Sequence, residues 1–561
     1  MNGGKVPHNQ LCMGRPPMAE ASRGSGGNLR RIAMLVAVAT ALSKLAGLFR
    51  QQAIAAAFGV GAAYDAFNYA YVLPGFLLIL LGGINGPFHS AMVSVMAKRE
   101  RQDSAQLLAA INTLVGLGLL VVTLLLVLLA NPLITLVGPG LDPELHALAV
   151  LQLRLMAPMA LLAGLIGLGF GALNAADVYW LPAISPLLSS LAVLIGLALL
   201  WLQAGAAIGT ATWAWAGAAV LAISTLAGAL LQWLVQLPAL AKQGLGQLRL
   251  NFHWRQAGVR EVLQVMWPAT LSSGMLQINV YTDLFFASGI AGAAAGLGYA
   301  GLLVQTPLGI LSNMLLVPLL PVFARLSAPE QRTELITRIR QGVMLSNASM
   351  LPLGALMVAL AAPIVALVYE RGSFDAAAAQ LVVGILMAYG LGMPAYLARD
   401  VLVRVFYALG DGQTPFRISI AGIGLNVGFD WLLVGGPSPS GLMVPALNAG
   451  APGLVLATVA VNVITCLVLL LALQHKLGRL PLQIWGRDSL LLTLAALVAG
   501  VIAWAMAQWI QWPSDLLGLA LQVALCGGVG AGLYGLLASS FGVPEARQLS
   551  RQLLAKLPGV S

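Results

Sequence analysis

Charged residues are scarce in this chain. Of its 561 residues only 9% are Asp, Glu, Lys or Arg, whereas 59% are hydrophobic. A water-soluble domain carries roughly 25% charged residues, so this surface cannot be solvated by water alone. The many apolar runs of about 20 residues are each long enough to cross a bilayer as a helix. The composition therefore excludes a soluble protein and indicates an integral membrane protein.

Cysteine is also rare, and catalytic motifs are missing. The three cysteines, Cys12, Cys466 and Cys526, have the spacing of neither a metal site nor a disulfide framework, and two of them lie in apolar runs. The sequence contains no P-loop, zinc motif or plausible nucleophile triad. We therefore expect no enzyme activity and no cofactor, apart from a possible sodium ion discussed below.

The first 28 residues lack the apolar core of a secretory signal peptide. They are rich in Gly, Ser, Pro and Arg, and we expect residues 1–30 to form a disordered cytoplasmic tail. The net charge of +10 does not indicate nucleic-acid binding, because the basic residues fall in short segments between apolar runs. That distribution is typical of the cytoplasmic loops of membrane proteins.

Hydropathy predicts an all-α polytopic protein of about 14 transmembrane helices. The expected spans are 31–58, 63–97, 105–130, 146–174, 181–203, 212–240, 259–288, 297–324, 334–369, 376–409, 414–434, 453–475, 488–510 and 516–541. With the N-terminus inside, the inside loops hold nearly all the loop Lys and Arg residues, whereas outside loops such as 131–145, 204–211, 289–296 and 435–452 hold none. Arg371, beside Glu370, is the exception. This alternation predicts an even number of helices and two cytoplasmic termini.

The longest basic connector, 241–258, divides the first twelve helices into six and six. We expect an N-lobe at 31–240 and a C-lobe at 259–475, followed by two additional helices at 476–541 and a cytoplasmic tail at 542–561. A proline lies inside the second span (YVLPGFLL) and inside the eighth (LVQTPLGIL), as in a transporter built from two repeats. The substrate path would then run between the lobes.

Four stretches resemble the MurJ (MviN) family of the multidrug/oligosaccharidyl-lipid/polysaccharide exporter superfamily. They are LSKLAGLFRQQAIAAAFGVGAAYDAFNYAYVLPG at 42–75, LNFHWRQAGVREVLQVMWPA at 250–269, YERGSFDAA at 369–377 and VFYALGDGQTPFRI at 405–418. The resemblance implies fourteen helices in two six-helix lobes plus two. It also implies that the chain flips lipid II, the lipid-linked peptidoglycan precursor, across the bacterial cytoplasmic (inner) membrane by alternating access.

Ionisable residues inside spans usually face a cavity or a partner, because burying them in lipid costs about 2.5–3.5 kcal/mol. Lys44 and Arg50 lie in the first expected span, and Asp65 opens the second. Cations suit a pyrophosphate-bearing substrate, and the resemblance places the family's first-helix basic pair at Lys44 and Arg50 and its DAF acid at Asp65. Alternatively, Arg50 and Asp65 form an ion pair near the outer boundary of the membrane.

The sequence departs from the family pattern in two cavity segments. LPNLLRR of the second helix is replaced here by LPGFLLILLGG, which leaves Leu78, Ile79 and Gly83 near basic or acidic positions. The eighth helix reads Tyr299-Ala300-Gly301-Leu302 where the family has a Tyr-Ala-Asp-Arg type of sequence. The cavity should therefore be less cationic than in typical members.

A second set of polar residues lies in the expected C-lobe. Asp283 is in the seventh span, Asn426 and Asp430 share a helix face in the eleventh, and Thr458 is in the twelfth. Their oxygen ligands suit a small hard cation. The resemblance adds Leu454 as a carbonyl donor and sodium as the ion. A proton-carrying carboxylate pair and a purely structural role remain open.

Lipid II flipping is accordingly the function that we expect, with membrane lipids, and possible cell-wall synthesis machinery, as partners. Two other transport functions are consistent with the sequence: flipping of another polyprenyl-linked glycan, and cation-coupled export of small amphiphiles. A membrane scaffold in envelope assembly is a fourth hypothesis.

Overall fold

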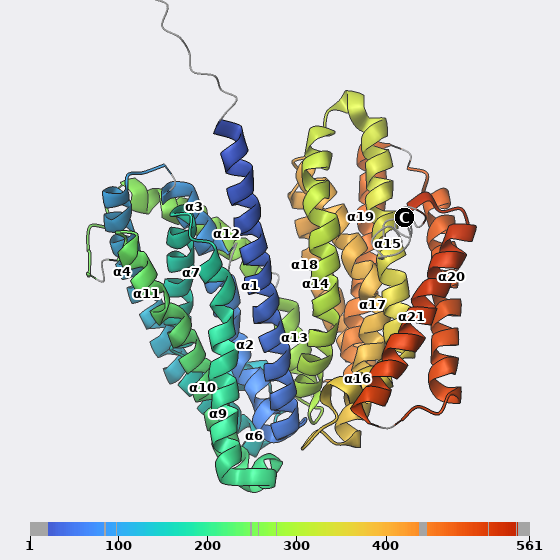
Figure 1. Cartoon of the computed structure of the whole chain (residues 1–561), viewed down its shortest axis with the longest axis horizontal. Coiled ribbons are helices and arrows are strands. Elements are labelled where there is room, and N and C mark those ends of the chain that lie inside the picture. Colours follow the sequence, from blue (N-terminus) through green and yellow to red (C-terminus); the bar gives the residue numbers. More distant parts are fainter. Residues whose placement is uncertain are drawn as a thin grey trace, which may run out of the picture.

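The computed structural model describes residues 21–83, 86–96, 98–246, 249–255, 257–275, 278–436, 446–478, 480–513, 515–545 and 547. Within these residues the regular structure is helical and forms two bundles that stand side by side (Figure 1). The first bundle contains α1 (Ala21–Phe58), α2 (Ala62–Gly82), α3 (Pro87–Met96), α4 (Arg101–Leu128), α5 (Ala130–Val137), α6 (Pro143–Met156), α7 (Met159–Ala175), α8 (Trp180–Ile184), α9 (Pro186–Ala204), η1 (Gly205–Gly209), η2 (Ala211–Trp213), α10 (Ala214–Leu234), α11 (Gln236–Lys242) and α12 (Ala257–Met275). The second bundle contains α13 (Ile278–Ala287), α14 (Ala293–Arg325), η3 (Pro329–Gln331), α15 (Arg332–Ala359), α16 (Ala361–Tyr369), α17 (Ala376–Ala408), α18 (Gln413–Val434), α19 (Gly450–Leu477), α20 (Leu482–Trp509) and α21 (Leu516–Ser540).

These helices confirm an all-α multi-pass membrane protein. In the described part of the chain, 12 helices are long and apolar enough to cross a membrane, or up to 13 when α6 and α7, bent by 40°, form one span. The expected seventh span, 259–288, corresponds to α12 and α13, which flank residues 276 and 277 outside the described part. About fourteen spans were expected; the count of 13 includes every one of them except this segment.

The chain crosses between the bundles later than the basic connector. α12 packs against α3, α2 and α4, whereas α13 packs mainly against α18 of the second bundle and also contacts α19 and, in the first bundle, α5. Buried Val259 and Val262 join the apolar core of the first bundle, and Arg99 forms an ion pair with Glu261 at 3.1 Å. The domain boundary expected at 241–258 therefore precedes a helix that still belongs to the first bundle.

Each terminal segment is described only in part. Residues 1–20 of the expected N-terminal tail lie outside the described residues, but α1 already begins at Ala21, ten residues before the expected span. No proline interrupts residues 21–58, although Gly24, Gly26 and Gly27 in the first turns are poor helix formers. Of the expected C-terminal tail, only residues 542–545 and 547 are described.

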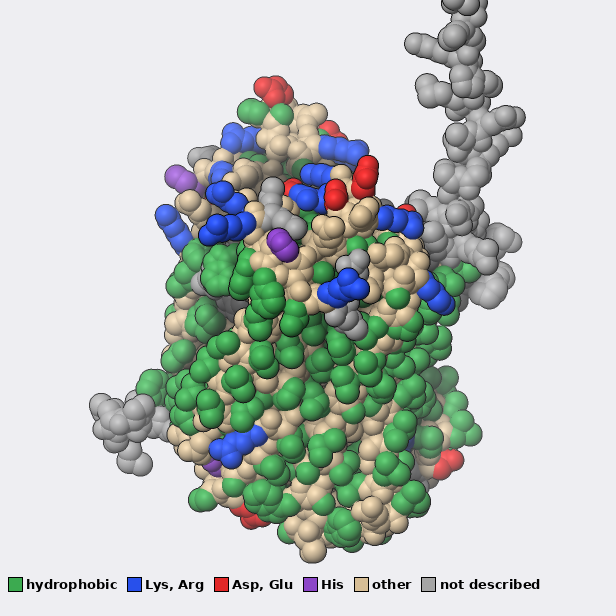
Figure 2. All heavy atoms as spheres, turned by 90° about the vertical axis from the view of Figure 1, so that its left-hand side faces the viewer, with side chains coloured by type: hydrophobic (Ala, Val, Ile, Leu, Met, Phe, Trp, Pro, Cys, Tyr) green, Lys and Arg blue, Asp and Glu red, His purple; other side chains and the backbone are tan. Residues whose placement is uncertain are grey.

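Surface chemistry divides the molecule along its long helices. Figure 2 shows a broad hydrophobic belt across the outer face of the first bundle, with Lys and Arg side chains gathered at the end where α1 begins and few at the other. We call these the basic end and the sealed end; at the sealed end the C-terminus of α1 meets α14 and the α16–α17 connection. A hydrophobic belt with a basic rim on one side is the surface expected of a membrane-embedded bundle.

Candidate substrate path and cation site

The two bundles are joined at the sealed end by a buried carboxylate. Asp65, near the start of α2, is 3% exposed, and its Oδ1 accepts a hydrogen bond from the backbone N–H of Ala295 at 2.8 Å. The backbone N–H groups of Gly292 and Ala294 also interact with this carboxylate. These are the unpaired donors at the N-terminus of α14, where a helix favours negative charge. Asp65 of the first bundle thus caps a helix of the second.

Aromatic side chains fill the same junction. The Tyr299 hydroxyl donates to the carbonyl of Gly59 at 2.8 Å, and the Tyr369 hydroxyl donates to the carbonyl of Tyr299 at 3.1 Å. The Tyr299 ring lies 4.8 Å from the Tyr64 ring and 5.4 Å from the Phe374 ring, measured between centroids. Such ring pairs add to the stability gained from burial. The family-like segment at 369–377 therefore supplies part of an interface between the bundles.

Backbone contacts complete this junction and explain one glycine. The N–H of Ser373 donates to the carbonyl of Ala56 at 2.8 Å, and the N–H of Gly140 donates to the Ser288 hydroxyl at 2.9 Å. Gly59, which follows α1, has φ +54°, and a Cβ there would collide with the Ser373 carbonyl. Glycine alone combines this left-handed backbone with so close an approach.

Arg50 lies on α1 beside the junction without an acidic partner. Its side chain is half-buried, and its Nε has no hydrogen-bond partner. The guanidinium is close enough to interact electrostatically with Tyr64 and Tyr71 of α2. Among the described residues Arg50 and Asp65 form no ion pair, because Asp65 is engaged with α14. The alternative of a local Arg50–Asp65 pair does not hold in this structure.

Toward the basic end, residues on α1 and α14 are open to the surroundings. Lys44 is exposed, as are Leu45 on the same helix and Met314 on α14. Of the positions where the sequence departs from the family, Ile79 is exposed, whereas Gly301 is buried. The structure thus separates the three residues expected at the substrate path. Lys44 is accessible, Arg50 lies deeper, and Asp65 is enclosed between the bundles, so contact between Asp65 and a substrate is not possible in this conformation.

The polar residues expected to meet in the second bundle do lie together. The Nδ2 of Asn426 donates to Asp283 Oδ1 at 3.2 Å and to Asp430 Oδ2 at 2.8 Å. The Thr458 hydroxyl donates to Asn426 Oδ1 at 3.2 Å. Asn426 and Asp430 are fully buried, and so is Leu454, one turn before Thr458 on α19. α13, α18 and α19 each contribute to this cluster.

One buried oxygen atom of this cluster indicates whether the cluster is suited to bind a cation. Asp430 Oδ1 has no hydrogen-bond partner among the described residues. Two carboxylates share one amide N–H₂ group, so negative charge exceeds the donors available to it, and a buried acceptor without a partner costs about 1–3 kcal/mol. No group of three or more His, Cys, Asp or Glu side chains suited to a metal occurs in the described residues. The oxygen donors of this cluster therefore suit a monovalent hard cation better than a transition metal.

The motif at 405–418 has a structural role. Asp411, between α17 and α18, accepts hydrogen bonds from the Thr414 backbone N–H at 3.0 Å and from Lys476 Nζ at 2.7 Å. The hydrogen bond from Lys476 lowers the pKa of the Asp411 carboxyl to about 2, and the Thr414 N–H contributes in the same direction. Asp375 likewise caps α17 by accepting from the N–H of Ala378 at 2.8 Å. Asp375 and Asp411 thus both stabilise helix starts.

The inter-bundle cap can be tested by substitution. We expect Asp65→Ala to weaken the junction by about 1 kcal/mol, the usual effect of losing a helix cap, which shifts an open–closed equilibrium roughly fivefold. Spin labels at the exposed positions Thr210 and Glu370, in a cysteine-free background, report the separation of the two bundles. In Asp65→Ala, the distribution of distances between the two spin labels should gain a population at longer distance than in the wild type.

Asp515 supplies a matched control for that measurement. It caps α21 within the second bundle, accepting from the N–H of Gly518 at 2.9 Å. Asp515→Ala should leave the distance distribution unchanged. If the two variants have the same distribution, Asp65 does not hold the bundles together.

Comparison with known proteins places these features in a family. The family profile described as "MurJ: Lipid II flippase MurJ" matches residues 54–519. The chain is 53% identical, over 87% of its length and 89% of the relative's, to a "Probable lipid II flippase MurJ" of Synechocystis sp.. It is 29% identical to the "Lipid II flippase MurJ" of Burkholderia cenocepacia, over 85% of this chain and 90% of that one.

Solved structures of other transporters share the fold of this chain. A "Lipid II flippase MurJ, inward closed conformation" superposes with a TM-score of 0.73 at 22% identity, covering 92% of this chain and 100% of the other. An inward-facing multidrug resistance MATE family transporter of the MOP superfamily has a TM-score of 0.54 at 14% identity, covering 80% and 98% of the two chains. At these identities the likeness establishes the shared fold alone.

Proposed function

Because this chain belongs to the lipid II flippase MurJ family, we propose that it carries lipid II across the cytoplasmic membrane by alternating access. It is a multi-pass transporter of peptidoglycan synthesis and not an enzyme. The observation that carries the mechanism is the junction at the sealed end, which closes one side of the molecule through Asp65 and Tyr299. We assign the basic end to the cytoplasm, since loops rich in Lys and Arg stay on that side.

Arg50 is the residue that we propose for the substrate pyrophosphate. Its guanidinium can donate two parallel hydrogen bonds to a phosphate, and it has no competing carboxylate in the described residues. Lys44, exposed nearer the basic end, is proposed as the first cation that the headgroup meets. The interior-negative membrane potential favours outward movement of an anionic headgroup by about 2.3 kcal/mol per charge per 100 mV.

Opening of the sealed end would complete the transfer. Arg50 interacts with Tyr64, and Tyr64 packs on Tyr299, which donates to Gly59. A headgroup bound at Arg50 would therefore lie next to the side chains that join the bundles. A ligand changes such an equilibrium only through a difference in its affinity for the two states. We propose that Asp65 acts on this closure and not on the substrate.

Rescue and reconstitution test this function. Expression of the chain in cells depleted of their own lipid II flippase should restore growth and make lipid II accessible outside. Purified protein in liposomes should then flip lipid II. Failure in both assays would refute lipid II transport. Transport of a different polyprenyl-linked glycan by the same liposomes would replace it, an outcome favoured by Leu78 and Ile79, which are apolar near positions that are basic or acidic in the family pattern.

We further propose that Asp283, Asn426, Asp430 and Thr458, with the carbonyl of Leu454, hold a sodium ion. Such an ion would offset one of the two negative charges on the carboxylates that share one amide group. A cation that binds only the folded state stabilises it by about 2.7 kcal/mol at one hundred times its Kd. The wild type should therefore unfold at a higher temperature in sodium than in choline.

Substitution at this cluster separates sodium from its alternatives. Asp430→Asn should abolish the sodium-dependent stabilisation, whereas Arg50→Ala in the other bundle should keep it. An unfolding temperature that changes with pH but not with sodium would identify Asp283 and Asp430 as a proton-carrying pair. Equal stability of the wild type in sodium and choline at every pH would leave the cluster a structural role only.

A further inference from the structure

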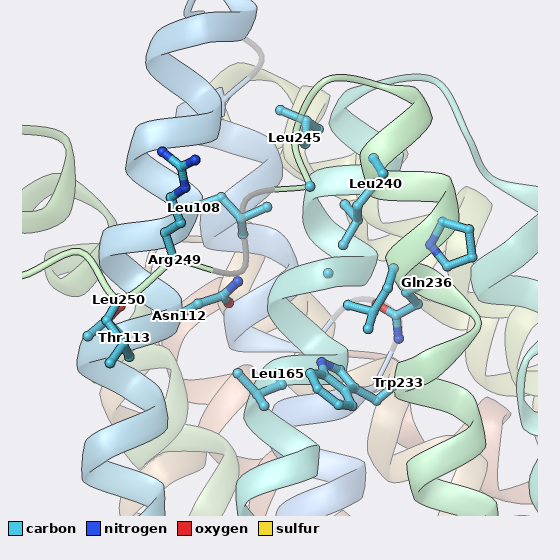
Figure 3. A pocket seen from close by; sticks show the side chains of 15 residues that line it. Leu108, Asn112, Thr113, Leu165, Trp233, Gln236, Leu240, Leu245, Arg249 and Leu250 are labelled. Atoms are coloured by element: carbon cyan, nitrogen blue, oxygen red, sulfur yellow. The ribbon is translucent and has the colours of Figure 1, made fainter.

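A cavity of about 440 Å³ lies in the first bundle, outside the path between the bundles. We call it the α4–α11 pocket; Figure 3 shows its lining, which comprises Leu108 and Asn112 of α4, Leu165 of α7, Trp233 of α10, Gln236 of α11 and Arg249 of the connector. In Figure 1, α4 and α11 lie at the edge of the first bundle farthest from the second. The pocket therefore opens on the outer face of the protein, near its basic end.

Two buried carbonyl oxygens of this pocket have no hydrogen-bond partner within the described part of the chain. Gln236 is 0% exposed; its Nε2 donates to the Gln232 carbonyl at 3.0 Å, which fixes the orientation of the amide, and its Oε1 is unpaired. The Oδ1 of Asn112 is also buried and unpaired. Gly169 on α7 leaves the space in front of Gln236, because a Cβ there would overlap Oε1. Both oxygens are acceptors that a ligand bearing hydroxyl groups would satisfy.

The side chain of Arg249 places a positive charge at the mouth of the pocket. Arg249 is exposed and pairs with no carboxylate in the described residues. Its position is set by Asn251, whose backbone N–H donates to Thr113 Oγ1 at 3.0 Å and whose Nδ2 donates to the carbonyl of Gln106 at 3.3 Å. No acidic side chain lines the pocket. A ligand with a net negative charge is therefore complementary, and one carrying an ammonium group would lack a counter-charge.

The surroundings are those of a lipid-facing site. Leu165 and Trp233 line the pocket with apolar surface, and Leu250 beside Arg249 is 74% exposed. On α10, Leu230, Leu231 and Leu234 are exposed in the hydrophobic belt. Acyl chains can lie along this surface while a polar headgroup enters between α4 and α11. A soluble anion would gain none of this apolar contact.

We propose that the α4–α11 pocket binds phosphatidylglycerol, with the phosphate on Arg249 and the glycerol hydroxyls donating to Gln236 and Asn112. This lipid is anionic, carries two headgroup hydroxyls as donors, and has acyl chains that remain in the bilayer. The proposal depends on the chain being embedded in a membrane and not on which substrate it transports. A failure of lipid II flipping would leave it unaffected.

Titration of the purified protein in detergent with phosphatidylglycerol, followed by native mass spectrometry, tests the proposal. Arg249→Ala should weaken binding about tenfold and Gln236→Leu about fivefold, as expected for losing a hydrogen bond to a charged and to a neutral group. Gly169→Ala, which crowds Gln236 without removing a polar group, should also weaken it. Lys242→Ala is the matched control, because it removes one exposed charge on α11 outside the lining.

Two further ligands define the chemistry that is recognised. Phosphatidylethanolamine, which has no net charge, should bind about tenfold more weakly than phosphatidylglycerol. Glycerol phosphate, which lacks acyl chains, should not compete at the same concentration. Wild-type affinity in both Arg249→Ala and Gln236→Leu, equal binding of the two lipids, or effective competition by glycerol phosphate would each overturn the proposal.

Discussion

Arg50→Ala is expected to reduce lipid II flipping by at least about tenfold and to fail in rescuing flippase-depleted cells. Hydrogen bonds to a charged group contribute about 1.5–3 kcal/mol each, and 1.4 kcal/mol corresponds to a factor of ten in binding. The guanidinium has no acidic partner in the described residues, so its removal leaves no carboxylate unpaired. The variant should therefore fold normally, and its defect should lie in transport.

The reduction in lipid II flipping should depend on which property of the Arg50 side chain a substitution retains. Arg50→Lys retains the charge but loses the planar pair of donors, so we expect an intermediate rate. Lys44→Ala should have a smaller effect, because Lys44 is exposed nearer the basic end. Flipping by reconstituted protein at matched expression and thermal stability measures all three variants. Wild-type flipping by Arg50→Ala would exclude a role for Arg50 in binding the pyrophosphate.

Arg340→Ala is expected to lower the free energy of unfolding by about 3–5 kcal/mol, more than any other substitution proposed for this protein. This is the usual effect of removing one partner from a buried ion pair. Arg340 on α15 binds Asp488 of α20 at 2.6 Å and Glu545, which follows α21, at 2.5 Å. The side chains of Asp488 and Glu545 are only 10% and 7% exposed. Without Arg340, Glu545 would lose its ion-pair partner, and Asp488 would keep only the exposed Arg487, at 4.0 Å. The contacts of α20 and of the segment after α21 with α15 would weaken.

A neighbouring arginine provides the control for this prediction. Arg338 on the same helix forms an exposed pair with Glu334 at 3.6 Å. Such a surface pair contributes about 0–1 kcal/mol, so Arg338→Ala should unfold close to the wild-type midpoint in a denaturant titration. Replacing Arg340, Asp488 and Glu545 together by apolar residues should recover much of the loss. Equal midpoints for Arg338→Ala and Arg340→Ala would contradict a stabilising role for this cluster.

Much of the fold followed from hydropathy and periodicity. The span expected at 376–409 is α17, Ala376–Ala408, and the one expected at 516–541 is α21, Leu516–Ser540. Long apolar helices are determined locally, because a bilayer requires each segment to satisfy its own backbone hydrogen bonds. The meeting of Asp283, Asn426 and Thr458 was also predictable, since each lies at a similar depth in its span.

Sequence alone determined that this protein is a helical membrane protein with a basic end, because composition and loop charge depend on no long-range contact. Its family-like motifs indicated transport. Only the tertiary structure decided what Asp65 does. As a single charge at the start of a helix it suggested a substrate or an ion pair with Arg50, yet it caps α14, 230 positions away in the chain. The partners of Tyr299 and Gln236 were equally unpredictable. Such contacts depend on how separate helices pack, and no periodicity within one segment encodes that arrangement.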